Sequence, residues 1–268
     1  MAVVGIPILI FSEYLIFALL LSLLSLFALF EVFRAIGLER RLVICVPAYL
    51  MALAYPILCY YLAGDHHIGM ILVGAAALFV YMMYTFAVAV FNKGAIKFFE
   101  VAEAFCVSSY VIFSFGAISI MRYMEEDKGL LYIILMLVSA WGSDVFAYFT
   151  GRLLGRHKLI PEVSPKKTVE GAVGGIICAG GLSMLYGFIV ASLTELAPNY
   201  IVLAVCGVLL AAFSQVGDLI ASLIKREHGI KDYGNIFPGH GGVMDRFDSI
   251  LAIATVLMAI CVMFPPFV

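Results

Sequence analysis

Four aspartates and several glycines are concentrated between Ser214 and Asp248, with apolar sequence on both sides. Asp218 lies deep inside the apolar segment before the glycines, whereas Asp245 and Asp248 open the segment after them. Acids that converge inside or beside a membrane repel one another unless a cation lies between them. Mg²⁺ prefers carboxylate oxygens, and water and substrate phosphates complete its coordination. We therefore predict that Asp218 and Asp245 ligate Mg²⁺, with support from Asp248 and from Asp144.

Asp144 belongs to an earlier apolar segment and lies well inside it. The i, i+4 and i+7 spacing of Asp144, Tyr148 and Gly151 places these residues on one face of a helix. An acid at this depth needs a partner. It either faces a cation at the bottom of a polar cavity or pairs with a lysine or arginine of another helix, and the sequence leaves both roles open.

Lysines and hydroxyl residues that could hold phosphate precede the sixth apolar segment. The run from Ser164 to Gly171, Ser-Pro-Lys-Lys-Thr-Val-Glu-Gly, would offer point charges and the N–H groups of a helix start to a phosphate. Its spacing is not that of a P-loop. A lysine pair in a loop can instead serve only to orient the protein in the membrane, so both roles stay open. The cations that we expect to clamp a polyphosphate are Lys166, Lys167, Lys225, Arg226, Lys231 and Arg246.

These groups favour a transfer reaction that relies on positioning and charge neutralisation rather than on a protein nucleophile. The sequence contains no Ser-His-acid signature. His240 lies in the glycine-rich loop, where the backbone can approach a ligand closely. It is a candidate phosphate donor or proton carrier, or it caps the turn.

The elements that must position these residues are membrane helices. Hydrophobic residues make up 64% of the 268 residues and charged residues 13%, far from the balance of soluble proteins. We predict an all-α, polytopic helical membrane protein with about 8–9 transmembrane helices and a cytoplasm-facing polar cavity. Val3 to Phe11 is either a ninth, tilted span or an interfacial segment, and Pro47 and Pro56 are expected to kink the second span. The eight long apolar segments cover about residues 14–36, 42–63, 68–91, 101–122, 129–152, 171–193, 199–224 and 243–265.

The basic residues indicate the orientation in the membrane. Nearly all lysines and arginines between the predicted spans fall on one side, and only Arg122 and Lys128 fall on the other. Short loops rich in basic residues stay in the cytoplasm, so we expect the active site on the cytoplasmic side. Residues 1–98 are expected to be mainly scaffold, and residues 99–268 are expected to carry the active site. The net charge of −2 argues against a nucleic-acid partner.

Acids in the first half of the chain are accounted for by local structure. Glu31 lies near the end of a span and within a turn of Arg34, which favours a local ion pair at the interface over a role in the site. Glu100 and Glu103 lie at the start of another span. A solvated helix start accounts for them as well as a role in the site does.

The sequence from Ser222 to Asp248 follows the pattern Ser222-x-x-Lys225-Arg226, four residues, Lys231-Asp232-x-Gly234, and then Phe237-Pro238-x-His240-Gly241-Gly242-Val243-x-Asp245-Arg246-Phe247-Asp248. This pattern resembles the signature of the phosphatidate cytidylyltransferases, also called CDP-diacylglycerol synthases. Residues 164–171 resemble the second motif of that family, with Val169 where an aromatic residue is common.

The resemblance implies that CTP and phosphatidic acid react to give CDP-diacylglycerol and pyrophosphate, with Mg²⁺ and a second cation such as K⁺. The lipid phosphate would attack the α-phosphorus of CTP in a cavity that opens to the cytoplasm and sideways to the inner leaflet of the bilayer. A homodimer is also implied, in the cell membrane if the source is bacterial. The expected catalytic residues are Asp218, Asp245, Asp248, Lys225, Arg226, His240 and Arg246. The expected substrate-binding residues are Ser164, Lys166, Lys167, Thr168, Glu170, Ser222, Lys231, Asp232, Gly241 and Gly242.

Two other classes of membrane protein share parts of this pattern. An ion-coupled transporter also places carboxylates on interrupted helices, but the polar groups here cluster on one side and no inverted repeat is visible. A polyprenol kinase or an archaeal-type ether-lipid cytidylyltransferase would use the same cation and phosphate chemistry. The run from Lys231 to Asp248 favours the phosphatidate enzyme over both.

Overall fold

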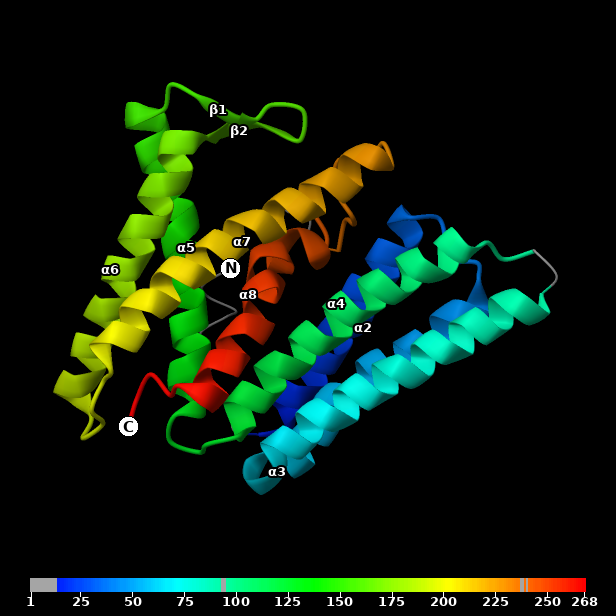
Figure 1. Cartoon of the computed structure of the whole chain (residues 1–268), viewed down its shortest axis with the longest axis horizontal. Coiled ribbons are helices and arrows are strands. Elements are labelled where there is room, and N and C mark those ends of the chain that lie inside the picture. Colours follow the sequence, from blue (N-terminus) through cyan, green and yellow to red (C-terminus); the bar gives the residue numbers. More distant parts are fainter. Residues whose placement is uncertain (1–13, 93–94, 237–238, 240) are drawn as a thin grey trace. The chain divides into compact units, whose positions relative to one another are not determined.

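A computed structural model of the chain describes residues 14–92, 95–236, 239 and 241–268 (Figure 1). Among these residues, helices that are long and apolar enough to cross a membrane account for eight spans, as predicted. The spans begin and end within a few residues of the predicted limits, because length and hydropathy alone define them. The elements in chain order are α2 (Leu15–Ala35), α3 (Leu42–Phe91), α4 (Phe98–Tyr123), α5 (Gly129–Leu154), β1 (Lys158–Ile160), β2 (Ser164–Thr168), α6 (Val169–Leu193), α7 (Tyr200–Glu227) and α8 (Met244–Met263).

Helix α3 contains the second and third spans without a loop between them. The backbone leaves the helical region only at His66 (φ −119°, ψ 25°), which separates the span Leu42–Gly64 from the span His66–Phe91. The proposed ninth span, Val3 to Phe11, lies outside the described residues.

Pro47 and Pro56 lie inside α3, and the φ and ψ angles at both prolines stay helical. Proline has no N–H group, so Pro47 leaves the carbonyl of Val43 without its helical donor. The Tyr84 hydroxyl donates to that carbonyl at 3.2 Å. The Tyr84 hydroxyl thus supplies the donor that Pro47 lacks.

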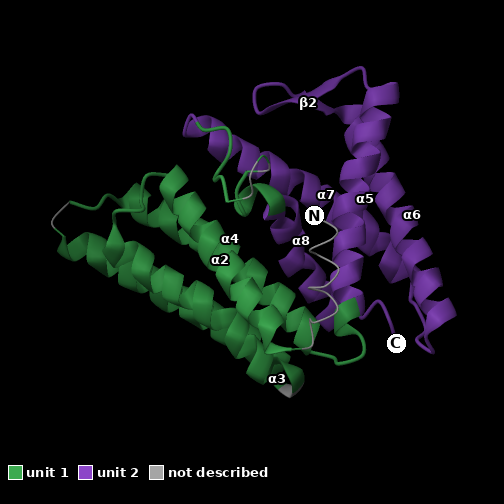
Figure 2. Cartoon of the chain, turned by 180° about the vertical axis from the view of Figure 1, so that it is seen from behind, with its two compact units in different colours: residues 1–130, 230–246 green, residues 131–229, 247–268 purple. Residues whose placement is uncertain are grey.

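The chain forms two compact units (Figure 2). Unit 1 comprises residues 1–130 and 230–246, and its helices α2, α3 and α4 pack against one another. Unit 2 comprises residues 131–229 and 247–268. These units do not follow the division at residue 98 that we expected. That division concerns where the catalytic residues lie, and it stays a prediction.

In unit 2, small residues let α6 and α7 approach closely. A Cβ atom on Gly207 of α7 would lie 2.6 Å from the carbonyl oxygen of Ala179 and from the hydroxyl of Ser183, both in α6. Helix pairs in membranes commonly pack through small residues in this way, since apolar side chains gain little by leaving the lipid. The tight pairing fixes the helix that follows Thr168 against the helix that carries Asp218.

An antiparallel hairpin of β1 and β2 connects α5 to α6, with Lys158 opposite Thr168 and Ile160 opposite Ser164. We expected this segment to be a loop. It is the only sheet in the part of the chain that the structure describes, so the all-α class stands. Thr168 ends β2 and caps α6, and its hydroxyl accepts a hydrogen bond from the N–H of Gly171 at 3.1 Å. A cap of this kind fixes where the helix begins.

Candidate active site

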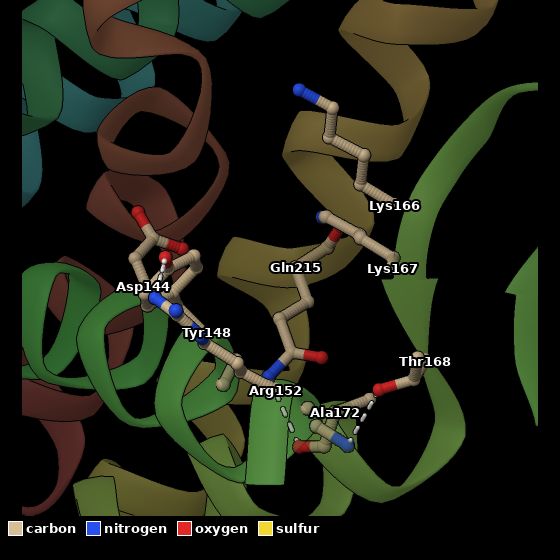
Figure 3. Close-up of a pocket in the computed structure, with 11 residues that line it drawn as sticks. Asp144, Tyr148, Arg152, Lys166, Lys167, Thr168, Ala172 and Gln215 are labelled. Atoms are coloured by element: carbon tan, nitrogen blue, oxygen red, sulfur yellow. Dashed lines mark hydrogen bonds between the residues drawn. The ribbon is translucent and has the colours of Figure 1, made fainter. Parts of the chain in front are cut away.

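A cavity of about 280 Å³ lies within unit 2, at the junction of α5, β2, α6 and α7 (Figure 3). Asp144 and Lys167 face it from opposite sides, and Thr168 marks its edge at the start of α6. Four predicted site residues therefore share one cavity with residues that we did not predict. The lining consists of Asp144, Ala147, Tyr148, Gly151, Arg152, Lys166, Lys167, Thr168, Gly171, Ala172 and Gln215.

Lys167 and Asp218 form an ion pair beside this cavity. The Lys167 Nζ lies 2.6 Å from Asp218 Oδ2 and donates more weakly to the carbonyl of Gln215 at 3.4 Å. The Ser222 hydroxyl lies 3.5 Å from the other oxygen of Asp218. Lys167, which we expected to bind phosphate, is therefore paired with Asp218, which we expected to bind a cation.

Asp144 and Asp248 complete an acidic cluster around Asp218. Each of the two interacts electrostatically with Asp218, and Asp144 also interacts with Lys167. Asp144 makes no direct ion pair with a lysine or arginine among the described residues, so the structural-pair role that we left open is not realised there. Gly217 lets α7 approach α8, because a Cβ atom there would overlap Ala252 and lie 2.9 Å from the carbonyl oxygen of Asp248.

The donor set of this cluster suits a cation that arrives together with phosphate. No group of three His, Cys, Asp or Glu side chains could hold a metal ion by itself within the described residues. Mg²⁺ is usually held by one or two carboxylates together with waters and substrate phosphates. Three carboxylates beside two lysines, Lys167 and Lys225, leave one negative charge in excess, which fits such an ion. The assignment of Asp218, Asp245, Asp248 and Asp144 as Mg²⁺ ligands stays a prediction.

Asp245, the other predicted Mg²⁺ ligand, belongs to unit 1. Its Oδ2 accepts hydrogen bonds from the N–H groups of Tyr233 at 2.7 Å and of Gly242 at 3.0 Å. The carboxylate thus closes the loop that precedes α8. Gly241 beside it has φ +82°, a conformation that a residue with a side chain rarely adopts.

Most of the remaining predicted residues are exposed. Arg226, Lys231, Asp232 and Arg246 are exposed, whereas Lys225 is half-buried and interacts electrostatically with Asp248. His240 lies outside the described residues, as do Phe237 and Pro238 of the signature.

Glu170 has a local structural role that we did not foresee. Its carboxylate accepts from the backbone N–H groups of Arg156 and His157 at 3.1 and 3.2 Å, and it lies 2.6 Å from the His157 ring. These contacts hold the turn that leads into the hairpin carrying Lys166 and Lys167. A direct contact of Glu170 with substrate stays a prediction.

Sequence reasoning missed two polar residues of the cavity. Gln215 donates to the Ser143 hydroxyl at 3.0 Å and to the Ala172 carbonyl at 3.1 Å, which ties α7 to α5 and α6. An amide three residues before Asp218, inside the same apolar segment, was the available signal. Arg152 donates to the Tyr148 hydroxyl at 3.1 Å, and we had used it only as an indicator of membrane orientation.

A model of the Cytidylyltransferase family matches residues 1–264 of this sequence. The chain belongs to that family. This match confirms the family that the two motifs indicated. It also extends the resemblance to the N-terminal part of the sequence, which contains neither motif.

Individual relatives agree with this assignment. The phosphatidate cytidylyltransferase of Staphylococcus epidermidis strain RP62A is 38% identical over 179 residues, which cover 67% of this chain and 64% of that protein. That of Bacillus subtilis is 38% identical over 185 residues, 69% of this chain and 66% of that protein. That of Staphylococcus aureus strain COL is 36% identical over 181 residues, 67% and 64% of the two chains. The matched part of the chain therefore spans slightly less than two thirds of each of these relatives.

Proposed function

We propose that this protein is a phosphatidate cytidylyltransferase. One phosphate oxygen of phosphatidic acid would attack the α-phosphorus of CTP, the bond between the α-phosphorus and the bridging oxygen would break, and CDP-diacylglycerol and pyrophosphate would leave. The observation that carries the proposal is the Lys167–Asp218 pair, which lies among two further acids beside a cavity lined with Lys166 and Arg152. Family membership supports it.

The cations of the cavity would bind the phosphate groups of both substrates. Lys167 would leave Asp218 and move to a phosphate, since a phosphate carries more negative charge than a carboxylate and offers more acceptor oxygens. Arg152 has the planar, forked donor set that suits phosphate oxygens. Phosphoryl chemistry of this kind needs positioning and charge neutralisation more than covalent catalysis, so no protein nucleophile is required.

Mg²⁺ is the proposed cofactor, held by Asp218 and Asp245 with support from Asp248 and Asp144. When bound, it would neutralise phosphate charge in the ground state and in the transition state. The excess of carboxylates over lysines around Asp218 supports this part of the proposal. We also propose a second, monovalent cation such as K⁺, and only the family resemblance supports it.

The lipid would enter from the side of the protein. Tyr148 and Phe149 of α5 are 59% and 53% exposed, and Leu153 is 78% exposed, so an apolar surface adjoins the cavity lining. In a membrane this surface contacts acyl chains, whereas Arg152 on the same helix can reach a headgroup phosphate. We propose that the cavity faces the cytoplasm, from the distribution of basic residues, and that the enzyme forms a homodimer.

The test uses purified protein with radiolabelled CTP, Mg²⁺ and phosphatidic acid, followed by extraction into chloroform. A chloroform-soluble nucleotide that contains the cytidine label is the expected product. Parallel reactions contain a polyprenol with γ-labelled CTP, or an archaeal-type ether lipid that ends in phosphate. Label transferred only to the polyprenol or only to the ether lipid would refute the phosphatidate assignment in favour of the corresponding enzyme.

A further inference from the structure

Glu31 of α2 is a buried acid in the first span. Its side chain is 1% exposed, inside a span that is otherwise almost wholly apolar. The direct ion pair that we expected with Arg34 does not form among the described residues. Instead, Glu31 Oε2 accepts a hydrogen bond at 2.9 Å from the backbone N–H of Met244, 213 residues away in the sequence. The contact lies entirely within unit 1.

Two glycines of the signature fold around the same carboxylate. A Cβ atom on Gly234 or on Gly242 would overlap the Glu31 carboxyl group. Both glycines are buried, so the loop backbone packs directly on the acid. Any larger residue at these two positions would push the loop away from α2. Glu31 and the glycines are therefore complementary parts of one contact.

Arg34, one turn after Glu31 on α2, holds the other end of the loop. Its guanidinium donates to the carbonyl of Tyr233 at 2.7 Å. Tyr233 is 1% exposed, and its N–H donates to Asp245 Oδ2 at 2.7 Å. A continuous set of hydrogen bonds thus runs from α2 through Tyr233 to Asp245, and a second runs from Glu31 to Met244, the neighbour of Asp245.

We propose that Glu31 is a positioning residue, which together with Arg34 holds the described parts of this loop, residues 230–236 and 241–246, in the conformation that the reaction requires of Asp245. The proposal rests on the proposed function for the role of Asp245, but the loop contact itself does not. A buried acid is costly, and an apolar residue of similar size would pack as well in a purely structural helix. The backbone groups of the loop, which donate to this carboxylate and pack against it, give the reason for an acid at this position.

The experiment compares Glu31→Gln, Glu31→Ala and Arg34→Ala with the control Ser25→Ala. Ser25 is a buried residue of the same helix whose hydroxyl has no hydrogen-bond partner among the described residues. Four quantities are measured on each full-length protein: kcat and KM for CTP over a series of Mg²⁺ concentrations, hydrogen exchange of the backbone amides of residues 230–236 and 241–246, and the melting temperature.

Glu31→Gln keeps the acceptor for Met244 and should stay within about threefold of the wild type in kcat/KM, because one neutral hydrogen bond replaces a charge-assisted one. Glu31→Ala leaves a buried N–H unpaired, so kcat/KM should fall by about tenfold to a hundredfold. The Mg²⁺ concentration for half-maximal rate should rise, and amide exchange in the loop should become faster. Arg34→Ala should speed the same amides, whereas Ser25→Ala should change none of these quantities.

Two results would overturn the proposal. One is a folded Glu31→Ala protein with wild-type kinetics. The other is a loss of activity in Glu31→Ala and Arg34→Ala while the loop amides exchange as slowly as in the wild type. If Glu31→Ala does not fold, Arg34→Ala decides: loop amides that exchange as slowly as in the wild type would then overturn the proposal. If the wild-type protein has no cytidylyltransferase activity, the proposed function fails, but the exchange data still test whether Glu31 holds the loop.

Discussion

Asp218→Asn is the change that tests the acidic cluster most directly. Asp218 forms the ion pair with Lys167 at 2.6 Å, and both Asp144 and Asp248 interact with it electrostatically. Asparagine has nearly the same size and keeps one acceptor oxygen, so the substitution removes charge and little else. The prediction is a large loss of activity in a protein that still folds.

We expect Asp218→Asn to change the activation free energy of the reaction by several kcal/mol more than it changes the free energy of unfolding. The side chains of Lys167 and Asp218 are 25% and 32% exposed, and ion pairs of that kind contribute about 0–1 kcal/mol to stability. Removing one of three neighbouring acids also relieves repulsion, which offsets part of this loss. If Asp218 helps a cation to supply about 4 kcal/mol of transition-state stabilisation, kcat should fall about a thousandfold, at about 1.4 kcal/mol per tenfold.

The assay measures initial rates of cytidylyl transfer against Mg²⁺ concentration, together with thermal melting in detergent. Glu227→Gln is the control, because it removes an equal charge from an exposed position at the end of the same helix. Its rate and melting temperature should match the wild type. A well-folded Asp218→Asn protein with near-normal activity would show that the carboxylate is structural and that a metal site lies elsewhere.

Three further predictions concern topology, packing and phosphate binding. Single cysteines at Gly229 and Glu126 in a cysteine-free protein should be labelled from opposite sides of the membrane, and labelling from one side would refute the orientation. Gly217→Ala should destabilise the protein by about 1–3 kcal/mol through overlap with α8, whereas Gly181→Ala, with open space around it, should not; equal melting temperatures would contradict the packing. Lys166→Ala should raise the KM for a substrate and lower kcat by about tenfold, and Lys166→Arg should recover part of both; unchanged kinetics in the alanine variant would leave this lysine a determinant of orientation only.

The membrane helices could be predicted from the sequence because each depends on a local property. A span such as Phe98–Tyr123 is recognised from the hydropathy of its own residues, whatever it packs against. The hairpin of β1 and β2 was missed because β1 is only three residues long and β2 is polar, so neither strand shows the run of alternating apolar and polar residues that identifies a strand. The pairing of Lys158 with Thr168 depends on the turn that brings the two strands together. The hydropathy of the residues contains no information about that turn.

The sequence singled out several residues that the structure brings together, but it did not predict their contacts. Residue types were sufficient to select Asp218 and Lys167, since a charged side chain in or beside a membrane span is costly and usually serves a function. Their direct pairing was not foreseen, because the two residues are 51 positions apart by their numbers and no periodic pattern joins them. Glu31 is the larger failure: the nearby Arg34 offered a local partner, and the backbone group that the acid actually meets comes from the opposite half of the chain.

The contact between Lys167 and Asp218 helps to explain how three acids can interact within apolar helices. An isolated carboxylate there is costly, and the lysine lowers this cost by supplying one positive charge beside Asp218. Because Lys167 also lines the cavity, a phosphate that enters would draw it off Asp218 and expose the carboxylate just when charge compensation by a cation is needed. The effects of substituting the two residues should then not be additive. Lys167→Ala combined with Asp218→Asn should lose less activity than the product of the single losses, and a fully multiplicative loss would show that the two residues act separately.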